Sequence, residues 1–73
     1  MLSEEEAEIV NHILSDEKTL NEMFGLYYGE SNEDEILRKI KDITKESFPS
    51  SYDKVNWRSI TDEIEAQIIG DEE

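Results

Sequence analysis

The stretch from residue 32 to residue 48, NEDEILRKIKDITKESF, constrains the fold more than any other part of the chain. Its apolar residues recur at the spacing of an amphipathic helix, whose apolar stripe has to be covered by other elements. They are Ile36, Leu37, Ile40, Ile43 and Phe48. Asn32 and Glu35 fit a capping box at its start, and Pro49 prevents the helix from continuing. The pattern therefore predicts a helix over 32–48.

Two shorter helices are predicted before this stretch. Ser3 and Glu6 form another capping-box pattern, followed by the apolar stripe Ile9, Val10, Ile13 and Leu14. This predicts a helix over 3–14. Asp16 then supplies an N-cap for a helix over about 17–24, and Gly25 is a suitable C-terminal stop. We expect the inward side chains of this second helix to be Leu20, Met23 and Phe24. A single kinked helix through both segments is the alternative.

A last helix is predicted from Asn56, a good N-cap, to Gly70. Its apolar stripe consists of Trp57, Ile60, Ile64 and Ile68. No segment alternates between apolar and polar residues as a half-buried strand does. The 73 residues therefore predict an all-α fold, a small single domain over 1–73 that forms a bundle or orthogonal array of about four short helices.

The charge of the chain is strongly acidic and unevenly distributed. Twenty acidic and seven basic residues give a net charge of −13. Residues 1–35 hold eleven acids and one lysine, residues 36–60 three acids and six bases, and residues 61–73 six acids and no base. Such a chain is unsuited to binding nucleic acid directly, because phosphates need cations. Either the basic middle neutralises the acidic flanks within the fold, or the acidic faces address a basic partner. Both can hold together.

Residues that carry catalysis or hold metals are scarce. The chain has no cysteine, and His12 is its only histidine. The acidic loops do not follow the spacing of an EF-hand calcium site, and Gly25 and Gly29 do not make a phosphate-binding loop. We therefore expect no enzyme activity, no metal site and no cofactor. The N-terminus is acidic where a secretory signal would be basic, and no apolar run is long enough to span a membrane. We therefore expect a cytoplasmic protein.

The least regular stretch, 26–31, suggests where a partner binds. Two adjacent tyrosines cannot both face the core of one helix, and tyrosine is a frequent anchor at protein interfaces. Carboxylates around such rings would suit a groove lined by Lys and Arg. The predicted partner-binding residues are Glu4, Glu5, Glu8, Tyr27, Tyr28, Glu30, Glu33, Asp34 and Glu35. The predicted partner is the basic surface of a protein.

In size and charge, the chain resembles the small acidic proteins of phages and mobile elements that occupy the nucleic-acid site of a host enzyme. Anti-restriction proteins, anti-CRISPR proteins and uracil-glycosylase inhibitors are of this type. The resemblance implies an inhibitor that acts by charge mimicry. One alternative is an immunity protein or antitoxin, since acidic four-helix immunity proteins share this size and a pair of tyrosines, although in another sequence context. The other is a small helical adaptor whose charge is incidental.

Overall fold

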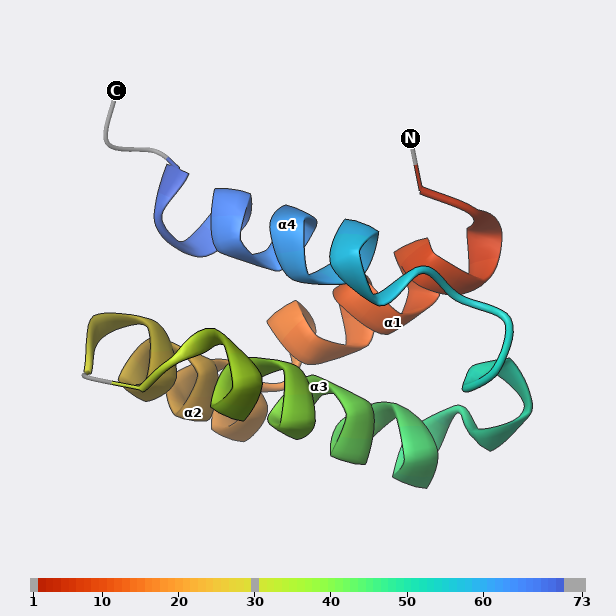
Figure 1. Ribbon diagram of the computed structural model, residues 1–73, viewed down its shortest axis with the longest axis horizontal. Helices are drawn as coiled ribbons and strands as arrows, with labels where there is room; N and C mark the ends of the chain where they lie inside the picture. The colour runs from red at the N-terminus through yellow and green to blue at the C-terminus, as the bar shows by residue number, and fades with distance from the viewer. Residues whose placement is uncertain (1, 30, 71–73) are drawn as a thin grey trace.

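The residues that the structure describes form four α-helices (Figure 1). The structure is a computed structural model and describes residues 2–29 and 31–70. Its elements are α1 (Glu4–Ser15), α2 (Glu17–Tyr28), α3 (Glu33–Ser47), a short 3-10 turn η1 (Pro49–Ser51) and α4 (Trp57–Ile68). These residues contain no strand, and the expected all-α class is confirmed. None of the described helices is long and apolar enough to cross a membrane.

The helices pack as two pairs around one core. In Figure 1, α1 and α4 form the upper pair, while α2 and α3 form the lower pair. The main contacts join α1 to α4 and α2, and α3 to α2 and α4, so each helix packs on two others. The core is mostly isoleucine and draws on all four helices. Its buried members are Ile9, Val10, Ile13, Met23, Ile36, Ile40, Ile60, Ile64 and Ile68.

Side-chain caps begin each α-helix, as the sequence predicts. Ser3 and Glu6 form the complete capping box of α1. Asp16 accepts a hydrogen bond from the backbone N–H of Thr19, which confirms the break between α1 and α2. Asn32 accepts from the N–H of Glu35, and Asn56 accepts from two N–H groups of α4. Local chemistry at the helix starts therefore fixes where the chain changes direction.

The end of α2 differs from the prediction. The helix does not stop at Gly25 but continues to Tyr28, and Gly29 is its C-cap. Leu26, Tyr27 and Tyr28 are therefore helical, whereas the sequence predicts an irregular stretch. Phe24, expected to point inward, is 38% exposed. The longer helix brings Leu26 and Tyr27 against the core, and this packing outweighs the tendency of glycine to end a helix.

The C-terminal ends of the other helices lie close to their predicted positions. α4 ends at Ile68, with Ile69 as its C-cap, rather than at Gly70. α3 ends at Ser47, and the N–H of Phe48 still donates to the carbonyl of Thr44. The acidic tail 71–73 lies outside the described residues.

Glu6 joins the first helix to the last. It is the one acidic side chain that is buried among the described residues. One carboxylate oxygen accepts from the N–H of Ser3 at 3.0 Å, and the other accepts from the N–H of Asn56 at 2.7 Å. The same side chain therefore caps α1 and holds the start of α4 beside it.

Candidate partner-binding surface

The predicted acidic contact residues fall into two sets at opposite ends of the molecule. Glu4, Glu5 and Glu8 lie on α1 near its N-terminus, while Glu33, Asp34 and Glu35 form the first turn of α3. Figure 1 shows these two helix starts at opposite ends of the long axis, whose extent is 31 Å. All six side chains are exposed. The structure does not bring them together on one small patch, and Glu30 lies outside the described residues.

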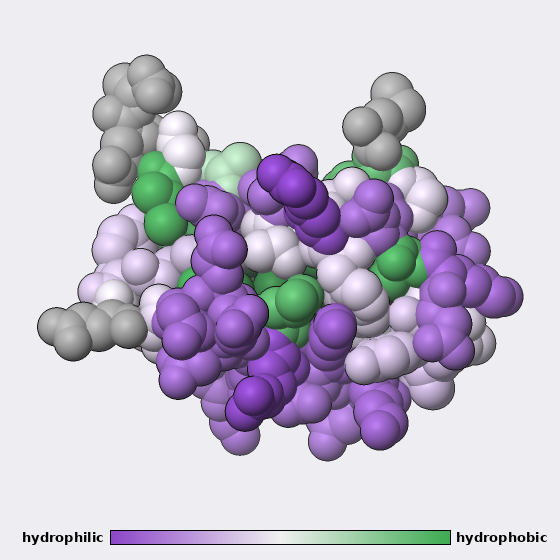
Figure 2. All heavy atoms as spheres, viewed as in Figure 1, coloured by the Kyte–Doolittle hydropathy of each residue, from purple (hydrophilic) through white to green (hydrophobic). Residues whose placement is uncertain are grey.

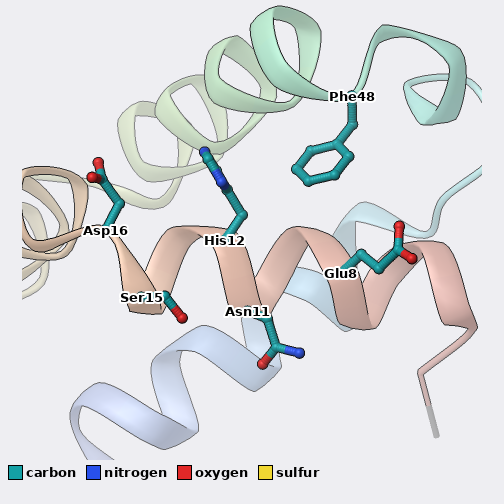
Figure 3. Close-up of a pocket in the computed structure, with 6 residues that line it drawn as sticks. All are labelled: Glu8, Asn11, His12, Ser15, Asp16 and Phe48. Carbon is teal, nitrogen blue, oxygen red and sulfur yellow. The ribbon is translucent and has the colours of Figure 1, made fainter.

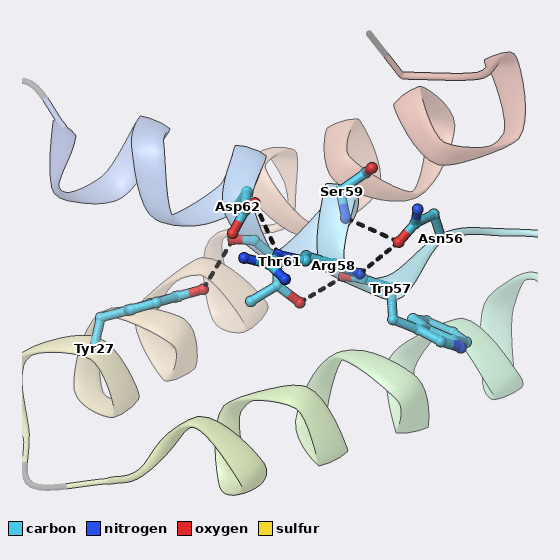
Figure 4. A network of polar contacts seen from close by, with 7 residues as sticks. All are labelled: Tyr27, Asn56, Trp57, Arg58, Ser59, Thr61 and Asp62. Atoms are coloured by element: carbon cyan, nitrogen blue, oxygen red, sulfur yellow. Dashed lines mark hydrogen bonds and ion pairs between the residues drawn. The ribbon is translucent and has the colours of Figure 1, made fainter.

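Tyr27 and Tyr28 lie at the C-terminal end of α2, and both contact α4. Figure 4 shows Tyr27 reaching from α2 to α4, where its hydroxyl donates to the carbonyl of Thr61 at 3.4 Å. The Tyr28 hydroxyl donates to the carbonyl of Ile68 at 3.2 Å. Tyr27 is half-buried, whereas Tyr28 is 59% exposed and stacks on Phe24. Tyr27 is thus mainly a packing residue, and Tyr28 with Phe24 presents the exposed aromatic surface.

A groove between α3 and α4 adds residues that the sequence analysis does not single out. It has a volume of about 510 Å³. Its floor includes Ile36, Leu37 and Ile69. Figure 2 shows hydrophobic atoms in green between these two helices, surrounded by hydrophilic residues in purple. We call this feature the α3–α4 groove.

Carboxylates flank the α3–α4 groove from both helices. Glu33 and Asp34 come from α3, and Asp62 and Glu65 come from α4. Arg58 is the one basic residue that lines it, so four carboxylates and one guanidinium leave a formal charge of −3. Asp62 and Glu65 are three residues apart on α4. That spacing places them on one face of α4, but only the tertiary fold shows that this face meets the start of α3.

The electrostatic environment of the groove is negative. Arg58 and Asp62 are 3.9 Å apart, and both side chains are largely exposed, so the pair is weak (Figure 4). Burial, with the negative charges of Glu65 and Asp62, raises the pKa of Tyr27 to about 12. A phenol is protonated at neutral pH even at its ordinary pKa of about 10, and the raised pKa of Tyr27 keeps its hydroxyl a donor to α4 into more alkaline solution.

Few of the described acidic side chains form hydrogen bonds or ion pairs within the fold. Glu6 is hydrogen-bonded to two backbone groups, which lower its pKa. Asp16 is held by Thr19, whose hydroxyl and N–H lower its pKa. Lys39 pairs with Glu22 at 2.7 Å and lowers the pKa of that carboxyl. Lys39–Glu22 and Arg58–Asp62 are the ion pairs among the described residues, so the basic side chains of α3 neutralise only a small part of the acidic surface.

A shallow depression around His12 offers less chemistry. Figure 3 shows the His12 ring rising from α1 beside the Phe48 ring, with Glu8 directed away from His12. The ring meets Phe48 edge-on at 5.4 Å, and its Nε2 is 3.4 Å from the hydroxyl of Ser47. Within the described part of the chain, no carboxylate lies at ion-pair distance from His12 to orient it. The histidine and serine therefore lack the third group of a nucleophile–base–acid arrangement.

Neither a metal site among the described residues nor a matching protein indicates a function. Residues 2–29 and 31–70 contain no group of three His, Asp or Glu side chains placed to hold a metal ion. No protein-family model, curated protein or solved structure matches the chain.

Proposed function

We propose that this protein is a non-catalytic inhibitor that occupies the nucleic-acid-binding surface of another protein by charge mimicry. The observation that most supports this proposal is that the exposed acidic side chains at both ends of the molecule form no ion pairs within the described residues. The exposed carboxylates of α1 and of the start of α3 take no part in the ion pairs of the described residues. They are held on capped helices and stay available to a basic partner.

The spacing of these carboxylates suits such mimicry. Glu4 and Glu8 are four residues apart on one helix, which separates them by about 6 Å along the axis. The two acidic sets lie toward the two ends of a 31 Å axis. That length corresponds to about nine base-pair steps of 3.4 Å along a duplex. A basic channel that holds a short duplex or single strand would meet negative charge at both ends of this molecule.

Capture from a host lysate at low and at high salt tests the proposal. The immobilised protein should retain a nucleic-acid-binding enzyme, identified by mass spectrometry, and retain less of it as salt rises. Added DNA or RNA should compete with the protein for that enzyme. Retention that is insensitive to salt and to nucleic acid would exclude charge mimicry.

Two triple variants locate the contact surface. Glu4→Gln, Glu5→Gln and Glu8→Gln remove three charges at one end, while Glu33→Gln, Asp34→Asn and Glu35→Gln remove three at the other. If the partner spans the long axis, each variant should weaken capture by a similar factor. If only one variant weakens capture, the partner uses that end alone.

A further inference from the structure

We propose that the α3–α4 groove binds an amphipathic helix of the partner protein that is rich in Lys and Arg. Apolar side chains of that helix would rest on Ile36, Leu37 and Ile69, and its cations would pair with the carboxylates on both sides. This inference rests on the proposed function and deepens it, because it specifies the form of basic surface that this end of the molecule takes.

Charge complementarity selects a cationic occupant. Carboxylates flank the apolar floor from two directions, with Glu33 and Asp34 on α3 and Asp62 and Glu65 on α4. Arg58 offsets only one of these four charges, and its contact with Asp62 is long and exposed. A guanidinium or ammonium group above the floor can therefore reach a carboxylate on either side.

The helical form of the occupant follows from the architecture. Addition of a peptide as a further β-strand needs a free sheet edge, and the described part of the chain contains no strand. An amphipathic helix instead uses apolar residues at three- and four-residue spacing to fill a groove between helices. The lining residues of α4 and its C-cap run from Arg58 to Ile69, about 16 Å along the helix axis, which gives a docked helix about three turns of contact.

A designed peptide provides the probe. It has about 18 residues of Lys and Leu, enough to form a helix, with the leucines on one face. A control peptide has the same composition with leucines spread around the helix. The amphipathic peptide should bind more tightly in fluorescence anisotropy. In ¹⁵N NMR spectra of the unmodified protein, it should shift the amide signals of Leu37, Asp62 and Ile69.

Two double variants with equal changes of net charge test the location. Asp34→Lys with Glu65→Lys reverses one charge on each side of the groove, and should weaken binding by about tenfold or more. Glu4→Lys with Glu8→Lys makes the same net change on α1, and should weaken it by less than about threefold. Arg58→Gln removes the one repelling charge and should tighten binding by about two- to fivefold. Circular dichroism checks that each variant keeps its helices.

Several results would overturn the groove proposal. Equal binding of both peptides, or equal weakening by both double variants, would show attraction to net charge alone. Amide shifts confined to residues outside the groove in the unmodified protein would also overturn it, independently of how the variants fold. If the peptide fails to bind while a nucleic-acid enzyme is still captured, only the groove proposal fails. If the peptide binds but no such enzyme is captured, charge mimicry fails instead.

Discussion

Glu6 carries a structural role that depends on its protonation state. Its two oxygens accept backbone hydrogen bonds from Ser3 and Asn56, and these bonds lower its pKa below the ordinary value of 4.5. A carboxyl with a lowered pKa stabilises the fold above its unfolded-state pKa, and this contribution is lost as the pH falls through the folded-state pKa. The link between α1 and α4 should therefore weaken in acid, below about pH 4.5.

We predict that Glu6→Gln destabilises the protein at pH 7 by about 1–3 kcal/mol, because an amide nitrogen cannot accept the second backbone bond. The variant should also lose less stability than the original chain as the pH falls below about 4.5, because it has no carboxyl with a lowered pKa to protonate. Urea unfolding at several pH values measures both effects. Glu8→Gln, an exposed change of the same charge on the same helix, is the control and should stay within about 0.5 kcal/mol. Equal effects of the two changes would remove the special role of Glu6.

Of the two backbone hydrogen bonds that Glu6 accepts, the sequence predicts only the one from Ser3. The capping box needs only Ser3 and Glu6, three residues apart, and the spacing predicts it correctly. The second hydrogen bond comes from Asn56, fifty residues further along the chain. No local pattern predicts a contact at that separation, so the burial of this carboxylate emerges only from the packing of α1 on α4.

At the scale of the helix, Gly25 and Gly29 have different roles in α2. Gly25 lies inside the helix, where a side chain would fit, and Gly29 lies at its end, where a side chain would clash. Gly25 lies inside α2, and a Cβ atom there would meet no atom within 4 Å. A Cβ atom on Gly29, at the helix end, would lie 2.6 Å from the carbonyl oxygen of Gly25. The prediction that α2 ends at Gly25 is wrong because the sequence alone does not show which of the two glycines needs to lack a side chain.

Gly25→Ala should therefore stabilise the protein by about 0.5–1 kcal/mol, since alanine favours a helix interior. In a domain of this size, that gain corresponds to a few degrees, about 2–8 °C, in Tm. Gly29→Ala should destabilise it, because the backbone must shift to remove the clash. Thermal unfolding followed by circular dichroism compares the two. A lower Tm for Gly25→Ala would show that α2 requires a flexible residue at its centre.

At the scale of the whole molecule, helix positions are predictable and the surfaces between helices are not. Periodicity and capping residues locate α1, α3 and α4 to within a few residues. The α3–α4 groove depends on how the start of α3 meets the middle of α4, which no spacing within either helix encodes. For the same reason, the sequence groups the carboxylates of α1 and α3 in one contact set, whereas the fold separates them.

Because of the high net charge, the stability of the whole molecule should increase as salt is added. The chain's net charge of −13 repels itself, and the two ion pairs among the described residues offset little of it. Raising salt from about 10 mM to about 1 M shortens the screening length from about 30 Å to about 3 Å. We therefore predict that Tm at pH 7 rises with added NaCl.

Neutralising part of the acidic surface provides the control for the salt experiment. A variant with Glu4→Gln, Glu8→Gln and Glu65→Gln changes three exposed residues and should show a smaller rise in Tm. A Tm that falls with salt in the original chain would mean that attraction between opposite charges outweighs repulsion. The acidic surfaces would then be engaged within the fold rather than available to a partner.

The packing of α4 on α1 also bears on how the protein is made in the cell. Ile60, Ile64 and Ile68 cover core residues of α1, and Glu6 reaches its second donor only when Asn56 is in place. A growing polypeptide that still holds α4 inside the ribosome therefore leaves the α4-facing side of the apolar stripe of α1 open to water. Assembly of the four helices has to wait until α4 has emerged, and it should then proceed in one cooperative step rather than helix by helix.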